Sequence, residues 1–524
     1  MRDFQFPGRS SVFATSGLCA TSHPLASRTA IDILQRGGNA ADAAIAAVMV
    51  LNLCEPHMTG LAGDCFLLLK PAGDADIIAL NGSGRAPAAS DAEALRAAGH
   101  ATVPLYGVAP VTLPGAVDAF CRLNADWGRM ALAELLAPAI RYAQDGVPVA
   151  PRVAQDWARV THLDGAARDF YLLSGKAPQP GQIFRAPGLA EVMTRIATEG
   201  RAGFYEGAVA ADMIDSLRGY GGAHSHADLD ATRCGYGAPI SSHYKGHELV
   251  EHAPNGQGAT ANLILNILAQ FDLAQLDPLG AERAHLEAEA TKLGYDARNR
   301  FLADPDHTAR LAHMLDPQTA ERLAALIDPR RVLPDPAPLT EEVHRDTVYL
   351  TVVDGEGMAV SLICSIFYPF GSGLASNRFG LLFQNRGAGF TLDAGHPNEL
   401  GPGKRPMHTI IPAMLRHEGR LVMPFGVMGG AYQATGHARF VSNLLDYGMD
   451  LQTAIDSPRA FAENGVLTLE RPYPEATFRA LADIGHSVKR AETPMGGAQA
   501  IRIHDSGVLE GASDPRKDGC ALGY

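Results

Sequence analysis

The stretch TVYLTVVDGEGMAVSLICSIF, residues 347–367, decides the fold. Residues 347–353 and 358–366 form two β-branched, aliphatic runs, and the Asp-Gly-Glu-Gly sequence between them is a strong signal for a turn. The pattern predicts a β-hairpin whose strands are buried. Thr347 is predicted to be the first residue of the first strand.

The segment before this hairpin has the opposite character. Residues 328–346 read DPRRVLPDPAPLTEEVHRD, with four prolines, many charges and few apolar side chains. Such a composition is typical of an exposed linker, where a break in the chain is tolerated. Thr347 therefore follows directly on a segment in which the chain can be cut.

Further out, helical and strand patterns alternate irregularly. Residues 41–53 (ADAAIAAVMVLNL) predict a buried helix, and residues 65–70 and 75–80 predict two neighbouring strands. Residues 113–330 are mainly helical in pattern, including an amphipathic stretch at 281–302, and residues 437–448 predict one more helix. The absence of regular βα alternation favours layered α+β packing over a doubly wound sheet.

Composition narrows the function classes. The chain has 524 residues, of which 46% are hydrophobic and 19% charged, which is ordinary for a globular protein. The net charge of −13 and the lack of a dense Lys/Arg stretch argue against a nucleic-acid partner. No apolar run is long enough for a signal peptide or a membrane span. Seven scattered cysteines without a CxxC pair predict reduced thiols in a cytoplasmic protein.

Several stretches together resemble the γ-glutamyltranspeptidase family. They include residues 346–374, GPGKRPMHTIIPAML (401–415) and GVMGGAYQATGHA (426–438). The remaining matches lie in QRGGNAADAAIAA (35–47), VTLPGAVDAF (111–120), PNGQGATANLILNIL (254–268), LEAEATKLGYDARNRFLADP (286–305) and GASDPRKDGCALGY (511–524). They follow the order and spacing of the family, so the resemblance covers nearly the whole chain.

The resemblance implies a four-layer αββα N-terminal-nucleophile hydrolase that is made as an inactive precursor. Self-cleavage between Asp346 and Thr347 would give a large segment, 1–346, and a small segment, 347–524. The two would remain together as a heterodimer that forms one catalytic domain, with further dimerisation left open. The expected partner is a small-molecule amide, and no cofactor, catalytic metal or membrane is expected.

The chemistry of this class explains why Thr347 is the expected nucleophile. A threonine hydroxyl needs an adjacent base. Cleavage would free the α-amino group of Thr347, whose reference pKa of roughly 7.7–8.0 suits a general base near neutral pH. By position, Gly429 and Gly430 match the family's oxyanion-binding glycines, and Ser365 matches a Thr that orients the nucleophile. His408 and Thr409 fall on a pair of serines that helps to hold nucleophile and substrate.

Other positions depart from the family and bear on the substrate. Phe367 and Gly389 stand where the family grips a substrate ammonium with Asn and Asp. Ser83 replaces the family's carboxylate-binding Arg, although Arg85 lies close by and has the planar fork that this task requires. Two new cations, Arg386 and His408, are predicted, and the lid loop between residues 390 and 401 is shorter. The prediction is hydrolysis of a small carboxylate-bearing amide such as oxamate.

Three alternatives remain open. The first is γ-glutamyl hydrolysis or transfer from glutathione-like donors, and the second is an uncleaved protein that only binds. The third is a metal-dependent hydrolase built on His224-Ser225-His226-Ala227-Asp228. Ser225 and Asp228, however, also fit a helix capping box, and no further metal-spaced residues accompany them. The HLEAEA stretch at His285 lacks the PCxxC of zinc deaminases.

Overall fold

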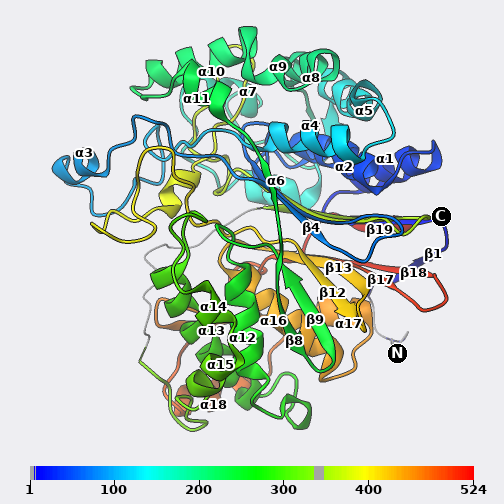
Figure 1. Cartoon of the computed structure of the whole chain (residues 1–524), viewed down its shortest axis with the longest axis vertical. Helices are drawn as coiled ribbons and strands as arrows, with labels where there is room; N and C mark the ends of the chain where they lie inside the picture. Colours follow the sequence, from blue (N-terminus) through cyan, green and yellow to red (C-terminus); the bar gives the residue numbers. More distant parts are fainter. Residues whose placement is uncertain (1–4, 6–7, 335–346) are drawn as a thin grey trace.

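The computed structural model describes residue 5 and residues 8–334 and 347–524. Two seven-stranded sheets lie face to face between two layers of helices (Figure 1). The first sheet has the order β1 (Val12–Ala14), β18 (Leu509–Ser513), β17 (Gly497–Ile503), β13 (Arg420–Met428), β12 (Ala413–His417), β9 (His247–Glu251) and β8 (Ile240–Tyr244). The second has the order β19 (Cys520–Gly523), β2 (Gly17–Thr21), β10 (Val348–Asp354), β11 (Ala359–Ser365), β3 (Asp64–Lys70), β4 (Ile78–Gly82) and β7 (Gly235–Gly237).

Each sheet buries its outer face under its own helices. The second sheet is covered by helices that include α1 (Pro24–Gln35), α2 (Ala40–Cys54), α4 (Ala116–Trp127), α5 (Leu132–Asp145) and α8 (Pro187–Glu199). The first is covered by α12 (Gly258–Leu268), α13 (Ala281–Phe301), α16 (Tyr432–Leu445) and α17 (Leu451–Asp456). A third core of aliphatic side chains, among them Leu18, Leu68 and Met414, fills the space between the sheets. The predicted αββα sandwich is confirmed.

The hairpin at residues 347–367 forms as predicted, at the centre of the second sheet. Strands β10 and β11 are antiparallel, with Val348 opposite Cys364 and Val353 opposite Ala359. Every residue of both strands is buried, which explains their continuous apolar pattern. Thr347 itself directly precedes β10 rather than opening it.

Other predicted elements are also confirmed. Helix α2 is buried over all 15 residues and begins with a capping box between Asn39 and Asp42. Strands β3 and β4 pair as an antiparallel hairpin. Five strands in the region predicted to be mainly helical were missed because they are short and alternate weakly: β5 (Val147–Pro148), β6 (Ile183–Phe184), β7, β8 and β9.

The prediction that residues 281–302 form an amphipathic helix needs correction. The helix α13 exists, but most of it is buried, including five of its eight charged residues. Four of these five are paired: Arg283 with Glu287, and Lys292 with Glu289. Alternating opposite charges therefore give a polar-looking sequence that folds into the interior.

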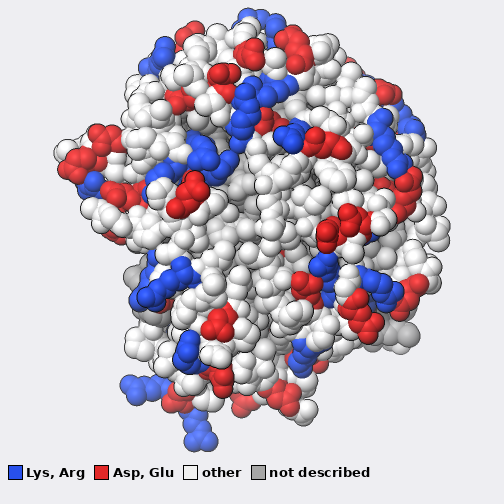
Figure 2. Space-filling model, viewed as in Figure 1, with Lys and Arg blue, Asp and Glu red and all other residues white. Residues whose placement is uncertain are grey.

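Residues 328–334 of the predicted linker are described, whereas 335–346, including Asp346, lie outside the described residues. The linker and the division into segments 1–346 and 347–524 thus stay predictions. All seven cysteines lie in the described part of the chain and are free thiols. None of the described helices is long and apolar enough to cross a membrane. Acidic and basic side chains are interspersed on the face seen in Figure 2.

Candidate active site

Strand register brings three polar side chains into one row at the end of the second sheet. Thr347 precedes β10, Ser365 ends the neighbouring β11, and Asp64 begins β3 opposite Ser365. All three are buried, with Thr347 only 1% exposed. The Thr347 hydroxyl donates to Ser365 Oγ at 3.4 Å. The predicted nucleophile and its orienting residue therefore lie together, as the sequence indicated.

Ser365 Oγ connects the candidate nucleophile to a cation. It accepts hydrogen bonds from the Arg386 guanidinium at 3.2 Å and from the Phe367 N–H at 2.8 Å. Arg386 also donates to the Thr409 hydroxyl at 3.0 Å. Because a guanidinium is always charged, a full positive charge lies two hydrogen bonds from the Thr347 oxygen.

Phe367 holds this cation in place. Its ring lies 4.0 Å from the Arg386 guanidinium carbon, an arrangement that favours a cation–π interaction. The backbone of Phe367 has φ of +81°, a conformation that is costly for an aromatic residue. Phe367 thus presents an apolar ring, and no carboxylate or amide, to Arg386.

The two glycines lie where the first sheet reaches the same region. Gly429 and Gly430 follow the end of β13 and precede helix α16, so that they lie beside the positive end of a 14-residue helix. Their φ values are +133° and +58°. A Cβ on Gly429 would approach the Cα of Gly496 to 2.9 Å, so glycine is required for space as well as for conformation.

Gln257 links the glycine turn to the segment of Thr409, which is a hydrogen-bond partner of Arg386. Its amide nitrogen donates to Thr409 O at 2.7 Å and to Gly430 O at 3.0 Å. Gln257 is fully buried at the start of α12, and Arg298 of α13 donates to its oxygen at 3.1 Å. The residues preceding β12 and those following β13 are therefore held together by one side chain.

The prediction that His408 is a new cation is wrong. His408 is fully buried, packs against the Phe66 ring at a tilt and contacts Asp64 Oδ2 at 2.9 Å. Burial, reinforced by the charge of Arg386, lowers the pKa of His408 to about 3 in spite of Asp64. Its Nδ1 accepts from the Ile410 N–H at 3.3 Å, so the neutral ring donates through Nε2. His408 supports Asp64 and adds no charge.

Arg85 lies in a different environment from Arg386. It donates to Asp304 Oδ2 at 3.3 Å and to Gly403 O at 2.8 Å, and its side chain is 39% exposed. The nearby Ser83 hydroxyl accepts from Asn255 at 3.0 Å. The structure thus joins Thr347, Ser365, Arg386 and Thr409 directly, and it ties Arg85 to Asp304.

A cavity of about 730 Å³ opens beside the glycine turn. Its lining includes Gly429, Gly496, Met58 and Tyr368 as well as several charged side chains. Met58 O accepts from the N–H of Ile366, the residue next to Ser365. Of the candidate residues that the structure describes, Gly429 is the one that lines this cavity.

The HxH motif has no metal-binding geometry. Ser225 and Asp228 form the predicted capping box of α11 (His226–Ala231), and His224 Nε2 contacts Val111 O at 3.0 Å.

The sequence did not single out Asp64 or Asn255 as residues of the site. Asp64 accepts from Gln384 and from the Gly84 N–H, each at 2.8 Å. Asn255 could have been identified from the sequence, because it lies in the PNGQG stretch (254–258), which is one of those that resemble the family.

The αββα sandwich with this buried hydroxyl at its central hairpin is that of an N-terminal-nucleophile hydrolase, an enzyme of amide bonds. The γ-glutamyltranspeptidase family model matches residues 26–524, and the chain belongs to this family. It is 36% identical to the glutathione hydrolase-like YwrD proenzyme of Bacillus subtilis (98% of this chain, 99% of the relative). It is also 36% identical to the oxamate amidohydrolase proenzyme of Klebsiella pneumoniae (98% and 100%). A crystal structure of cephalosporin acylase from Bacillus halodurans matches with a TM-score of 0.92 at 35% identity, covering 100% of this chain and 99% of that chain.

Proposed function

We propose that this protein cuts itself between Asp346 and Thr347 and then hydrolyses a small carboxylate-bearing amide through an acyl-enzyme on Thr347. The observation that carries the proposal is the contact chain from Thr347 to Ser365 to Arg386. It puts a hydroxyl that can attack a carbonyl next to a cation that can hold a carboxylate. Two relatives that are 36% identical are named as proenzymes, which agrees with self-cleavage.

The reaction then follows from the groups in place. The Thr347 Oγ attacks the amide carbonyl, and its proton passes to the free α-amino group of Thr347. Backbone N–H groups at Gly429 and Gly430 stabilise the oxyanion, a contribution of about 3–4 kcal/mol per donor. The proton moves to the leaving nitrogen, the C–N bond breaks, and ammonia or an amine departs. Water then attacks the ester, which releases the acid and restores Thr347.

The position of Arg386 favours a short acid. In oxamate the carboxylate is bonded directly to the reacting carbonyl, so one guanidinium beside the nucleophile can hold it. In a γ-glutamyl donor the carboxylate lies at the far end of a carbon chain and carries an ammonium beside it. Phe367 faces Arg386 where that ammonium would need an anionic partner. The name of the Klebsiella pneumoniae relative agrees with an oxamate-like substrate.

The other candidate residues take supporting roles in the proposal. Thr409 orients Arg386, and His408 acts through Asp64. Arg85 is a second, outer contact for an anionic group, because its side chain is partly exposed. The free thiols support a reducing, cytoplasmic compartment.

Self-cleavage is tested by intact mass and N-terminal sequencing of the purified protein. We expect two fragments, beginning at Met1 and Thr347, that comigrate under native conditions. A single uncut chain that hydrolyses amides would overturn Thr347 as an N-terminal nucleophile. A single uncut chain without activity would instead support the binding-protein alternative.

The substrate is tested by ammonia release from oxamate, from glutamine and from a neutral amide of similar size. Arg386→Gln should raise KM for oxamate by roughly 10- to 100-fold, since it removes a charge-assisted hydrogen bond. The effect on the neutral amide should be smaller, and Arg386→Lys should recover part of the loss. Faster turnover of glutamine or of a γ-glutamyl anilide would favour the γ-glutamyl alternative and leave the role of Thr347 intact.

A further inference from the structure

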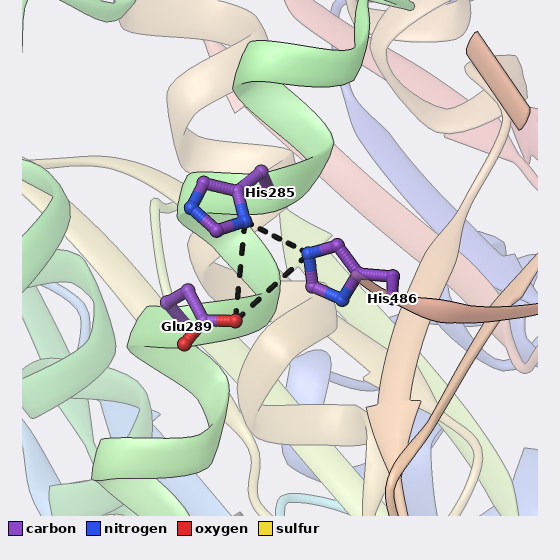
Figure 3. A group of neighbouring side chains, drawn as sticks. All are labelled: His285, Glu289 and His486. Atoms are coloured by element: carbon purple, nitrogen blue, oxygen red, sulfur yellow. Dashed lines mark hydrogen bonds and ion pairs between the residues drawn. The ribbon is translucent and has the colours of Figure 1, made fainter. Parts of the chain in front are cut away.

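Three buried side chains converge far along the chain from the active-site residues. His285 and Glu289 project from one face of α13, one helical turn apart, and His486 comes from the turn between α18 (Glu475–Asp483) and β16 (Ser487–Arg490). Figure 3 shows the three groups pointing toward one another. The side chain of each is at most 3% exposed. The catalytic mechanism uses none of them.

The inner atoms of the three groups lie close enough together to bind one metal ion after a small adjustment. His285 Nδ1 lies 2.8 Å from His486 Nε2, and each of these atoms lies 3.9 Å from Glu289 Oε1. A tetrahedral Zn²⁺ with bonds of about 2.1 Å to nitrogen and oxygen needs ligand atoms about 3.4 Å apart. Binding therefore requires the two nitrogens to separate by roughly 0.6 Å and Glu289 Oε1 to approach them by roughly 0.5 Å.

The outer atoms of His285 and Glu289 make hydrogen bonds of the kind that hold metal-ligating side chains in place. His285 Nε2 lies 2.9 Å from the Asp328 carbonyl, which can only accept, so this nitrogen holds the proton and Nδ1 presents its lone pair inward. Glu289 Oε2 accepts from the Leu333 N–H at 3.0 Å. His486 Nε2 holds the proton of the 2.8 Å contact between the two rings, because His285 Nδ1 accepts it. A metal replaces the proton between the two rings once His486 takes its other tautomer.

One cation competes for the same carboxylate. Lys292 Nζ donates to Glu289 Oε1 at 2.8 Å and to Leu333 O at 3.1 Å. A bound metal must take Oε1 from this ammonium, which weakens the affinity of the site without changing its geometry. Beside it lies a cavity of about 30 Å³ lined by Lys292, Val332 and His486, among others. This is room for one water molecule as a fourth ligand.

We propose that His285, Glu289 and His486 form a structural Zn²⁺ site. His285 and Glu289 belong to the large segment and His486 to the small one, so that a metal bridges the two. It also anchors Asp328 and Leu333, the last described part of the chain before the proposed cleavage point. The bridging role between two cut chains rests on the proposed function, whereas the metal site itself does not.

The test is a Zn²⁺ titration of the full chain after it has been stripped with a chelator, followed by calorimetry and elemental analysis. We expect one zinc per chain, and Co²⁺ in its place should give the visible absorption of a tetrahedral site. His486→Gln and Glu289→Gln should each weaken binding at least tenfold. His504→Gln is the matched control, because His504 also contacts a carboxylate, Glu510, at 3.1 Å but belongs to no three-ligand group among the described residues.

A variant that should bind zinc more tightly is also needed, because a misfolded protein can lose affinity but is not expected to gain it. Lys292→Met removes the competing ammonium and should tighten zinc binding about tenfold. No zinc in the wild type, or unchanged binding in His486→Gln and Glu289→Gln, would overturn the site. Binding is expected equally in the Thr347→Ala protein, so a failure of self-cleavage and a failure of the metal site give different results. Zinc should also raise the denaturant midpoint for separation of the cut segments.

Discussion

The two sheets meet at the proposed active site, and they contribute to it in different ways. The second sheet supplies side chains in strand register: Thr347, Ser365 and, through the loop after β11, Arg386. The first sheet supplies backbone, in the turn of Gly429 and Gly430 between β13 and α16. We call Thr347, Ser365 and Arg386 the side-chain half of the site, because they contribute functional groups. The turn of Gly429 and Gly430 is the backbone half, because it contributes N–H groups in a particular conformation.

The two halves should therefore tolerate different substitutions. The side-chain half should lose its function when a functional group is removed, even if the substituted side chain keeps the original shape. The backbone half is expected to lose its function when a side chain is added, because the proposed mechanism requires its N–H groups to point at the oxyanion. Gln257 connects the halves, so its loss should affect both.

The largest expected effect is in the side-chain half. Thr347→Ala should lower kcat by more than about 10³-fold and leave the chain uncut, because the attacking oxygen is gone. Thr347→Ser keeps that oxygen and should retain cleavage and activity. Activity assays and intact mass check both variants. The control is Thr351→Ala in the same strand, whose hydroxyl donates to Val360 O at 3.0 Å, and it should keep kcat within a few fold.

Next comes the backbone half. Gly429→Ala should lower kcat by about 10²- to 10³-fold, because its Cβ displaces Gly496 and turns the oxyanion donors. Gly448→Ala is the matched control, since its φ is +57° but no atom lies within 4 Å of a Cβ built there. It should cost roughly 1 kcal/mol of stability and leave kcat unchanged. Equal kcat losses in the two variants would show that backbone strain alone accounts for the effect.

Much of the side-chain half could be predicted from the sequence, and little of what supports it. The Thr347 hairpin is visible because its two strands are adjacent in the chain and continuously apolar. The resemblance singled out Ser365 and Thr409, which hydrogen bonds join to Thr347 and Arg386, whereas the oxyanion role of the glycines stays a prediction. The neutral state of His408 could not be read, because it depends on burial against Asp64, a contact spanning 344 residues. The same holds for His285 and His486, which meet across 201 residues.

Substitution of Gln257, which connects the two halves, should have an intermediate effect on kcat. Gln257→Leu removes both hydrogen bonds that join Thr409 to Gly430, and it should lower kcat by roughly tenfold or more and destabilise the protein by about 2 kcal/mol. Gln452→Leu is the control, because Gln452 is equally buried and bridges Asp456 and Ser513 O in another part of the molecule. It should cost similar stability and leave kcat intact. Steady-state kinetics and denaturant melts separate the two outcomes.

The smallest effect concerns acid stability. The folded pKa of His408 is about 3, below its unfolded value near 6.5, so the unfolded chain binds more protons between these limits. Stability should therefore fall as the pH drops below about 6.5, and His408 alone should account for a loss of about 2 kcal/mol at pH 5. The check is urea unfolding of the wild type and His408→Gln between pH 8 and pH 5.

His408→Gln should flatten this decline below pH 6.5, while the two proteins should show parallel pH dependence above pH 7. The Gln side chain keeps a donor for Asp64, which limits the direct cost of the substitution. An unchanged slope would mean that His408 binds its proton equally well in the folded and the unfolded chain. A second positive charge would then lie beside Arg386 below about pH 6.5, and the side-chain half would hold two cations there instead of one.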